Sequence, residues 1–96
     1  MNLIEHLDAV CDEASLVRFI EALADDLEEE IKKEKQNPSS PYGPGANGWE
    51  NRDLSSFLRA SLAWVEDSND GIETYQEPEN PWKRVADILY SGKIYE

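Results

Sequence analysis

The sequence predicts an all-α fold: a compact, irregular bundle of about four helices with two long loops. Apolar residues recur at helical spacing in four separate segments. Residues typical of helix caps precede these segments, and proline and glycine interrupt the chain between them. No two segments form a convincing strand pair. These three observations favour helices packed on helices.

The first two helices are predicted in the N-terminal third of the chain. Asn2 can cap a first helix of about three turns, whose apolar face is formed by Leu3, Ile4, Leu7, Val10 and Cys11. Residues 12–15 then supply a break and a new cap. A second helix is predicted near residues 16–35, with an inward face of Leu16, Val17, Phe19, Ile20, Leu23, Ala24, Leu27 and Ile31.

The first long loop is predicted over residues 36–48, which contain three prolines and three glycines. Such a density of breakers permits neither a helix nor a strand ladder, so we expect a flexible loop. Neither half of the chain has enough apolar residues for a core of its own. The loop is therefore expected to lie within one helical domain that spans residues 1–96.

The third and fourth helices are predicted in the C-terminal half. The third is capped by Asn51 or Asp53 and ends near Asp67, and its stripe contains Leu54, Phe57, Leu58, Ser61, Leu62 and Val65, with Trp64 on the flank. The second long loop covers residues 68–80. The fourth helix starts with Asn80 as cap and Pro81 at its first position, and Gly92 is the expected stop.

The charge of the chain limits its partners. It carries 21 acidic and nine basic residues, for a formal net charge of -12. Phosphate backbones and anionic membranes would be repelled, which argues against nucleic-acid and membrane binding, whereas a basic protein would be attracted. No apolar run is long enough to cross a bilayer, and the first residues do not resemble a secretory signal. With a single cysteine, the sequence favours a cytoplasmic protein.

Two short tryptophan motifs, Trp49-Glu50-Asn51 and Pro81-Trp82-Lys83, are the most recognisable features of the chain. Together with Leu54, Phe57-Leu58, Trp64, Ala86, Ile88-Leu89 and Tyr95-Glu96, they resemble an uncharacterised bacterial family of small acidic proteins, a domain of unknown function. The resemblance covers about residues 19–96. It implies a fold relationship and brings no established activity, substrate or catalytic residue.

No constellation of residues predicts catalysis, a cofactor or a metal site. His6 and Cys11 would project about 140° apart on one helix, so they cannot form a nucleophilic dyad. Cys11 is instead expected in the core. Residues 66–77 match a calcium-binding loop only imperfectly, because the first ligand is Glu66 and Pro78 disrupts the exiting helix. Glu50 is most simply a partner for a helix N-terminus. The sequence therefore predicts no enzyme.

The sequence favours a non-catalytic protein-interaction domain of an immunity or regulatory type, with a basic protein as partner. The candidate partner-binding residues are Asp25, Asp26, Glu29, Glu30 and Trp64. Trp49 and Trp82 are expected in the core, and Trp64 at its edge. The alternative is a small-molecule-binding or accessory domain that uses the aromatic residues as a pocket. The oligomeric state and the identity of the partner are left open.

Overall fold

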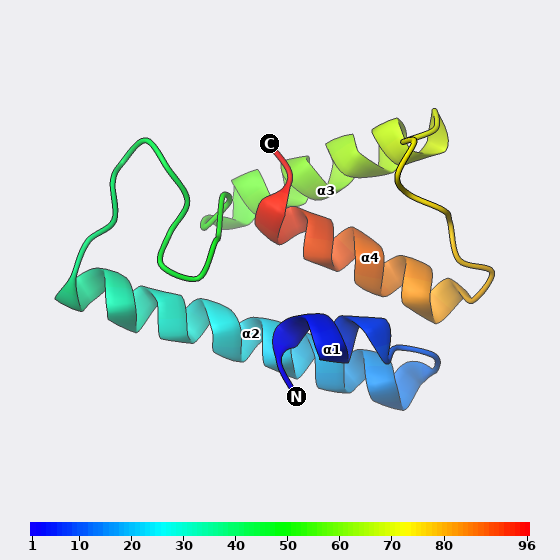
Figure 1. The fold of residues 1–96 in the computed structure, drawn as a ribbon, viewed down its shortest axis with the longest axis horizontal. Coiled ribbons are helices and arrows are strands. Elements are labelled where there is room, and N and C mark those ends of the chain that lie inside the picture. Colours follow the sequence, from blue (N-terminus) through cyan, green and yellow to red (C-terminus); the bar gives the residue numbers. More distant parts are fainter.

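The computed structural model describes residues 1–96, and every regular element in it is a helix. The helices are α1 (Leu3–Asp8), α2 (Glu13–Gln36), α3 (Leu54–Asn69) and α4 (Pro81–Ile94). Helix α4 lies between α3 and α2, and α1 lies against the N-terminal half of α2 (Figure 1). Helices α2 and α3 pack on α4 and not on each other. The predicted all-α bundle of four helices with two long loops is confirmed.

The polar caps that the sequence predicted begin the helices. The side chain of Asn2 accepts a hydrogen bond from the backbone N–H of Glu5 at the start of α1. Asp12 and Asp53 cap α2 and α3 in the same way, through the N–H groups of the residues three positions later. Asn80 caps α4, and its amide also donates to the carbonyl of Cys11 at 2.7 Å. This second bond ties the start of α4 to the turn between α1 and α2.

Three predictions about single residues are wrong. Cys11 is exposed rather than buried, because α1 already ends at Asp8 and Cys11 belongs to the turn that leads into the cap of α2. Trp82 is 37% exposed, whereas Trp49 is 2% exposed and belongs to the core as predicted. Gly92 does not stop α4, which continues to Ile94.

Gly92 permits close packing between α4 and α3. A Cβ atom at this position would lie 2.6 Å from a ring carbon of Phe57 and 2.6 Å from the hydroxyl of Ser61, both on α3. Contacts this short are not tolerated by real Cβ atoms, so the two helices can approach this closely only because the side chain is absent. In a sequence, a glycine near a helix end can mark either the end of the helix or a close contact with another element. Gly92 marks a close contact.

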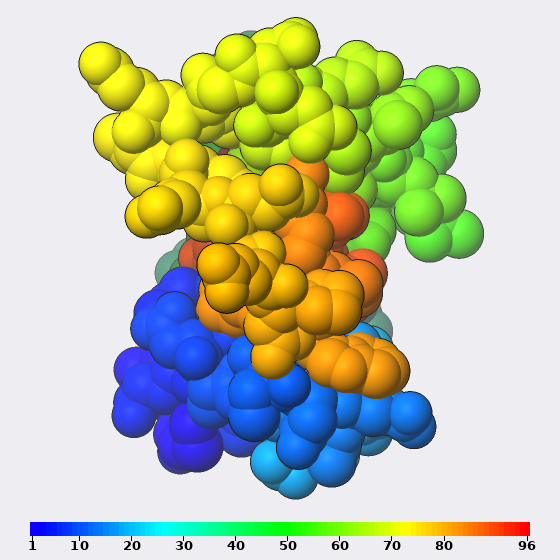
Figure 2. All heavy atoms as spheres, turned by 90° about the vertical axis from the view of Figure 1, so that its right-hand side faces the viewer, coloured from blue at the N-terminus to red at the C-terminus, as the bar shows by residue number.

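The buried apolar core is small and lies where α1, α2 and α4 meet. It consists of Leu7, Val10, Leu16, Phe19, Leu23, Trp49 and Ala86. In Figure 2, α1 and α2 form a lower layer, α4 lies in the middle and α3 forms an upper layer. The accessible surface is 6464 Å², whereas a compact monomer of this mass exposes about 5,600 Å². The fold thus leaves more surface exposed than its size requires.

Candidate functional site

The hollow with the most apolar residues in its lining is a groove between α2 and α3. It forms because α2 and α3 both pack on α4 and not on each other. A gap remains between them, and Leu89 of α4 contributes to its lining. The groove has a volume of about 490 Å³. Its apolar lining consists of Ile20, Leu23, Ala24 and Leu27 from α2, Leu54 and Phe57 from α3, Leu89 from α4, and Trp49. Asn51, Arg52 and Asp53 line it at the N-terminal end of α3.

Large apolar side chains along this groove remain exposed to solvent. Leu54 is 74% exposed, Leu58 is 57% exposed and Leu62 is 52% exposed, and they follow one another at four-residue intervals along α3. Ile20, which lines the groove from α2, is also exposed. A contiguous exposed apolar surface on a domain of this size is typical of a binding site.

A second hollow continues the groove over the outer side of α3. It is lined by Leu54, Ser55, Leu58, Arg59 and Leu62, and it has a volume of about 530 Å³. Leu54 belongs to both hollows, so they form one surface. The sequence predicted that the leucines of α3 face inward; the structure shows that they face this surface.

A buried carboxylate holds the segment that closes one end of the groove. The Glu30 side chain is fully buried, and its Oε1 accepts hydrogen bonds from the backbone N–H groups of Asn47 and Trp49 at 3.0 and 3.1 Å. Its Oε2 has no hydrogen-bond partner, and the Nε atom of Arg52 lies 4.0 Å away. A Cβ atom on Gly45 would fall within 2.3 Å of the carboxylate. A side chain at position 45 would therefore have to displace the Glu30 carboxylate.

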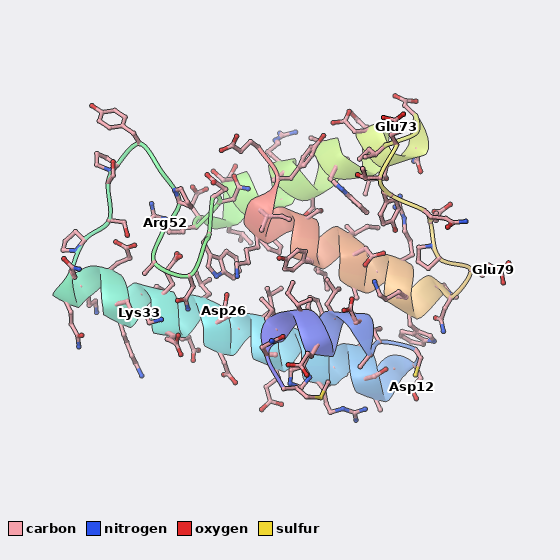
Figure 3. All side chains as sticks on the ribbon, in the orientation of Figure 1. Asp12, Asp26, Lys33, Arg52, Glu73 and Glu79 are labelled. Carbon is pink, nitrogen blue, oxygen red and sulfur yellow. The ribbon has the colours of Figure 1, made fainter.

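A second polar cluster joins this segment to α4. The carboxylate of Asp26 accepts hydrogen bonds from the indole Nε1 of Trp49 at 2.8 Å and from the Nζ of Lys93 at 2.7 Å. The Lys93 ammonium also lies 5.6 Å from the centre of the Trp49 ring, within the range of a cation–π contact. Figure 3 shows Asp26 on α2 and Arg52 where the chain enters α3. Together these bonds fix the Trp49 side chain at the floor of the groove.

The Trp-Glu-Asn motif is explained by the same segment. Trp49 fills the core next to Phe57, the backbone N–H of Glu50 donates to the carbonyl of Lys93, and the side-chain amide of Asn51 donates to the carbonyls of Gly92 and Tyr95. The motif thus joins the end of α4 to the start of α3. Partial burial and the neighbouring Glu96 carboxylate raise the pKa of Glu50.

The structure separates the acidic residues that the sequence grouped as candidate partner contacts. Asp25 and Glu29 are exposed, and Lys33 and Asn47 hold the pKa of Glu29 below its usual value. Asp26 is engaged by Trp49 and Lys93, and Glu30 has no exposed surface at all. Asp25, Asp26 and Glu29 line a shallow hollow next to α1, on the side of α2 that faces away from the groove. Glu30 therefore acts in folding, not as a surface charge.

Trp64 belongs to an aromatic cluster between α3 and α4. Its ring meets that of Tyr75 edge to face at 4.8 Å, and the guanidinium of Arg84 lies 4.9 Å from its centre. The Tyr75 hydroxyl donates to the buried Asp87, and burial raises the pKa of Tyr75. The hollow beside this cluster has a volume of about 140 Å³, whereas pockets for small organic ligands measure about 300–1,000 Å³. The cluster mainly packs against itself.

The acidic loop does not adopt the geometry of a calcium-binding loop. Helix α3 extends to Asn69, so Glu66 and Asp67 are helical. Asp67 accepts a hydrogen bond from the Tyr95 hydroxyl, and Glu77 pairs with Arg84. No three His, Cys, Asp or Glu side chains converge in a way that could hold a metal ion.

The groove residues were misplaced because the apolar stripes on α2 and α3 are wider than one buried face. The eight residues of α2 that were predicted to face inward span about 160° of the helix circumference, and α3 adds leucines at 54, 58 and 62 to the face that contains Phe57. A core-facing stripe on a surface helix is typically about 100° wide or somewhat more, so residues at the edges of a wider stripe can lie outside the core. The width of the stripes was therefore the available signal.

Comparison with known proteins gives a family and no function. None of the helices is long and apolar enough to cross a membrane. No curated protein and no solved structure matches the chain. Residues 12–96, which contain the groove, the Glu30 contacts and both tryptophan motifs, match a family of unknown function, DUF7660. The chain belongs to this family.

Proposed function

We propose that the protein is a non-catalytic interaction domain, of a regulatory or immunity type, that binds a segment of another protein in the groove between α2 and α3. The observation that carries this proposal is the row of exposed leucines at positions 54, 58 and 62, next to an apolar groove of about 490 Å³. Leaving this surface in water is unfavourable by about 25 cal/mol per Å², so a partner that covers it would gain that free energy.

The polar groups of the structure support a non-catalytic role. Glu30, Asp26 and Lys93 are the most strongly buried charged groups near the groove, and all three are used to fix residues 45–51 and α4. Their contacts give these three charged groups a structural role. The exposed apolar surface has no such role within the protein. The net charge of -12 supports a basic partner. The unpaired Cys11 fits the cytoplasmic location proposed from the sequence.

A designed helical peptide that stands in for the natural partner tests the proposal. The probe is a fluorescently labelled peptide of three heptads with leucine and isoleucine on one face and lysine on both edges. We expect it to bind the protein and to raise the anisotropy of the label. Leu58→Glu should weaken binding at least about tenfold, because it places a charge in the apolar surface. Ile4→Glu, at an exposed apolar site on α1, is the control.

Both variants should keep the helical circular dichroism of the wild type, since exposed positions tolerate such changes within about 0.5 kcal/mol. Absence of peptide binding to the wild type, or equal weakening by Leu58→Glu and Ile4→Glu, would refute the proposed site.

A further inference from the structure

The exposed edge of α2 has the residue pattern of one strand of a coiled coil. Its apolar residues are separated by three, four, three and four positions: Val17, Ile20, Ala24, Leu27 and Ile31. This alternation is the a and d spacing of a heptad repeat. Ile20, Ala24 and Leu27 line the groove, and the other two continue the same row at both ends. We call these five residues the α2 seam.

The positions on the two sides of the α2 seam differ in environment. On one side, the g positions are Leu16, Leu23 and Glu30, all buried within the protein. On the other side, the e positions within the seam are Glu21 and Glu28, both exposed. They lie seven residues apart, two turns along the same edge. The only side of the seam that a partner can reach is therefore acidic.

We propose that the occupant of the groove is an amphipathic α-helix that lies along the α2 seam and presents lysine or arginine to Glu21 and Glu28. This inference rests on the proposed function and adds the chemistry of the partner. Charges at the e and g positions set partner choice in coiled coils, because opposite charges pair across the interface and like charges repel. Leu54 and Phe57 on α3, which line the groove opposite α2, would cover the other side of the same helix.

The same pattern argues against a second copy of this chain as the occupant. An antiparallel pair of α2 helices would place e positions opposite e positions, which brings Glu21 of one copy next to Glu28 of the other. A parallel pair would need the g positions, but Leu23 and Glu30 are buried within each copy. The net charge of -12 on each chain adds a further repulsion.

Three labelled peptides with one apolar face test the inference. They share three heptads of leucine and isoleucine and differ only at the edge positions, which are all lysine, all glutamine or all glutamate. They are used at nanomolar concentration and titrated with wild type, with Glu21→Lys/Glu28→Lys, and with Asp25→Lys/Glu29→Lys. The last variant has the same change in net charge farther round α2 from the seam, next to α1, so it separates local pairing from overall charge.

We expect the lysine peptide to bind the wild type at least about tenfold more tightly than the glutamate peptide at 50 mM salt, with less discrimination at 500 mM. Glu21→Lys/Glu28→Lys should reverse the order, and Asp25→Lys/Glu29→Lys should preserve it. Retention of the order in both variants would overturn the inference. An equal change in the order of peptide affinities in both variants would also overturn the inference.

The remaining outcomes distinguish the inference from the proposed function. If all three peptides bind equally well and Leu58→Glu abolishes their binding, the inference of a basic partner is overturned, whereas the groove remains a binding site. Failure of every peptide to bind would overturn both. Sedimentation of the wild type as a dimer, converted to a monomer by Leu58→Glu, would identify a second copy as the occupant and overturn the inference.

Discussion

Substitution of Glu30 separates a structural role from a role in partner binding. Its Oε1 is the hydrogen-bond acceptor for the N–H groups of Asn47 and Trp49, both close to the core. Glu30→Ala would leave two backbone donors without a partner, at a cost of about 1–3 kcal/mol each. We expect a loss of about 2–5 kcal/mol in the free energy of unfolding, which is a large part of the stability of a domain of this size.

Glu30→Gln and Glu29→Ala are the informative controls for this prediction. Glutamine keeps the Oε1 acceptor and adds an unpaired amide, so its cost should be smaller, about 1–2 kcal/mol. Glu29 is exposed and pairs with Lys33 one turn later, so its removal should change the free energy of unfolding far less than removal of Glu30. Urea unfolding followed by circular dichroism measures all three. A Glu30→Ala variant within about 0.5 kcal/mol of wild type would refute the assignment of Glu30 to folding.

Three further predictions test other parts of the fold. Gly92→Ala should lower the free energy of unfolding by about 1–2 kcal/mol, because overpacking against α3 outweighs the gain in helix propensity. Gly43 lies in open space, so Gly43→Ala should change it by less than about 0.5 kcal/mol, and thermal melts compare the two variants. Trp49→Ala should cost about 3–5 kcal/mol in urea unfolding and Trp82→Ala about 1, and equal losses would contradict the burial of Trp49 alone. Hydrogen bonds from the backbone and side chain of Ser56 lower the pKa of Asp53. The Asp53 cap therefore stabilises the fold above about pH 4, and this stabilisation is lost as the pH falls through the lowered pKa. Asp53→Asn should therefore be less stable than wild type at about pH 7, and the difference should disappear as the pH falls through the lowered pKa of Asp53; a difference that persists in acid would count against this reasoning.

The parts of the fold that depend on local chemistry were predictable from the sequence. The cap residues Asn2, Asp53 and Asn80 begin their helices because a short polar side chain satisfies backbone N–H groups a few residues away. Proline and glycine between residues 36 and 48 end α2 for equally local reasons. These signals do not depend on what the rest of the chain does.

The surface of the molecule depends on which apolar faces find a partner, and local patterns do not contain that information. Leu54 and Leu58 have the spacing of core residues, but α3 packs only on α4, so one side of its stripe faces solvent. Glu30 has the sequence context of a surface charge, since it lies among Glu28, Glu29 and Lys32. Its burial arises from a loop 15 to 19 residues later that folds back over it.

A nuclear magnetic resonance titration of methyl-labelled protein with the lysine-edged peptide tests the groove most directly. We predict that saturable shifts are confined to the methyl groups that line the two joined hollows, among them those of Ile20, Leu27, Leu54, Leu58 and Leu62. The methyl groups of Ile4 on α1 and Ile94 at the end of α4 are exposed elsewhere and should not move. Saturable shifts at Ile4 or Ile94 with an unchanged groove would contradict the assignment of the groove as the binding site.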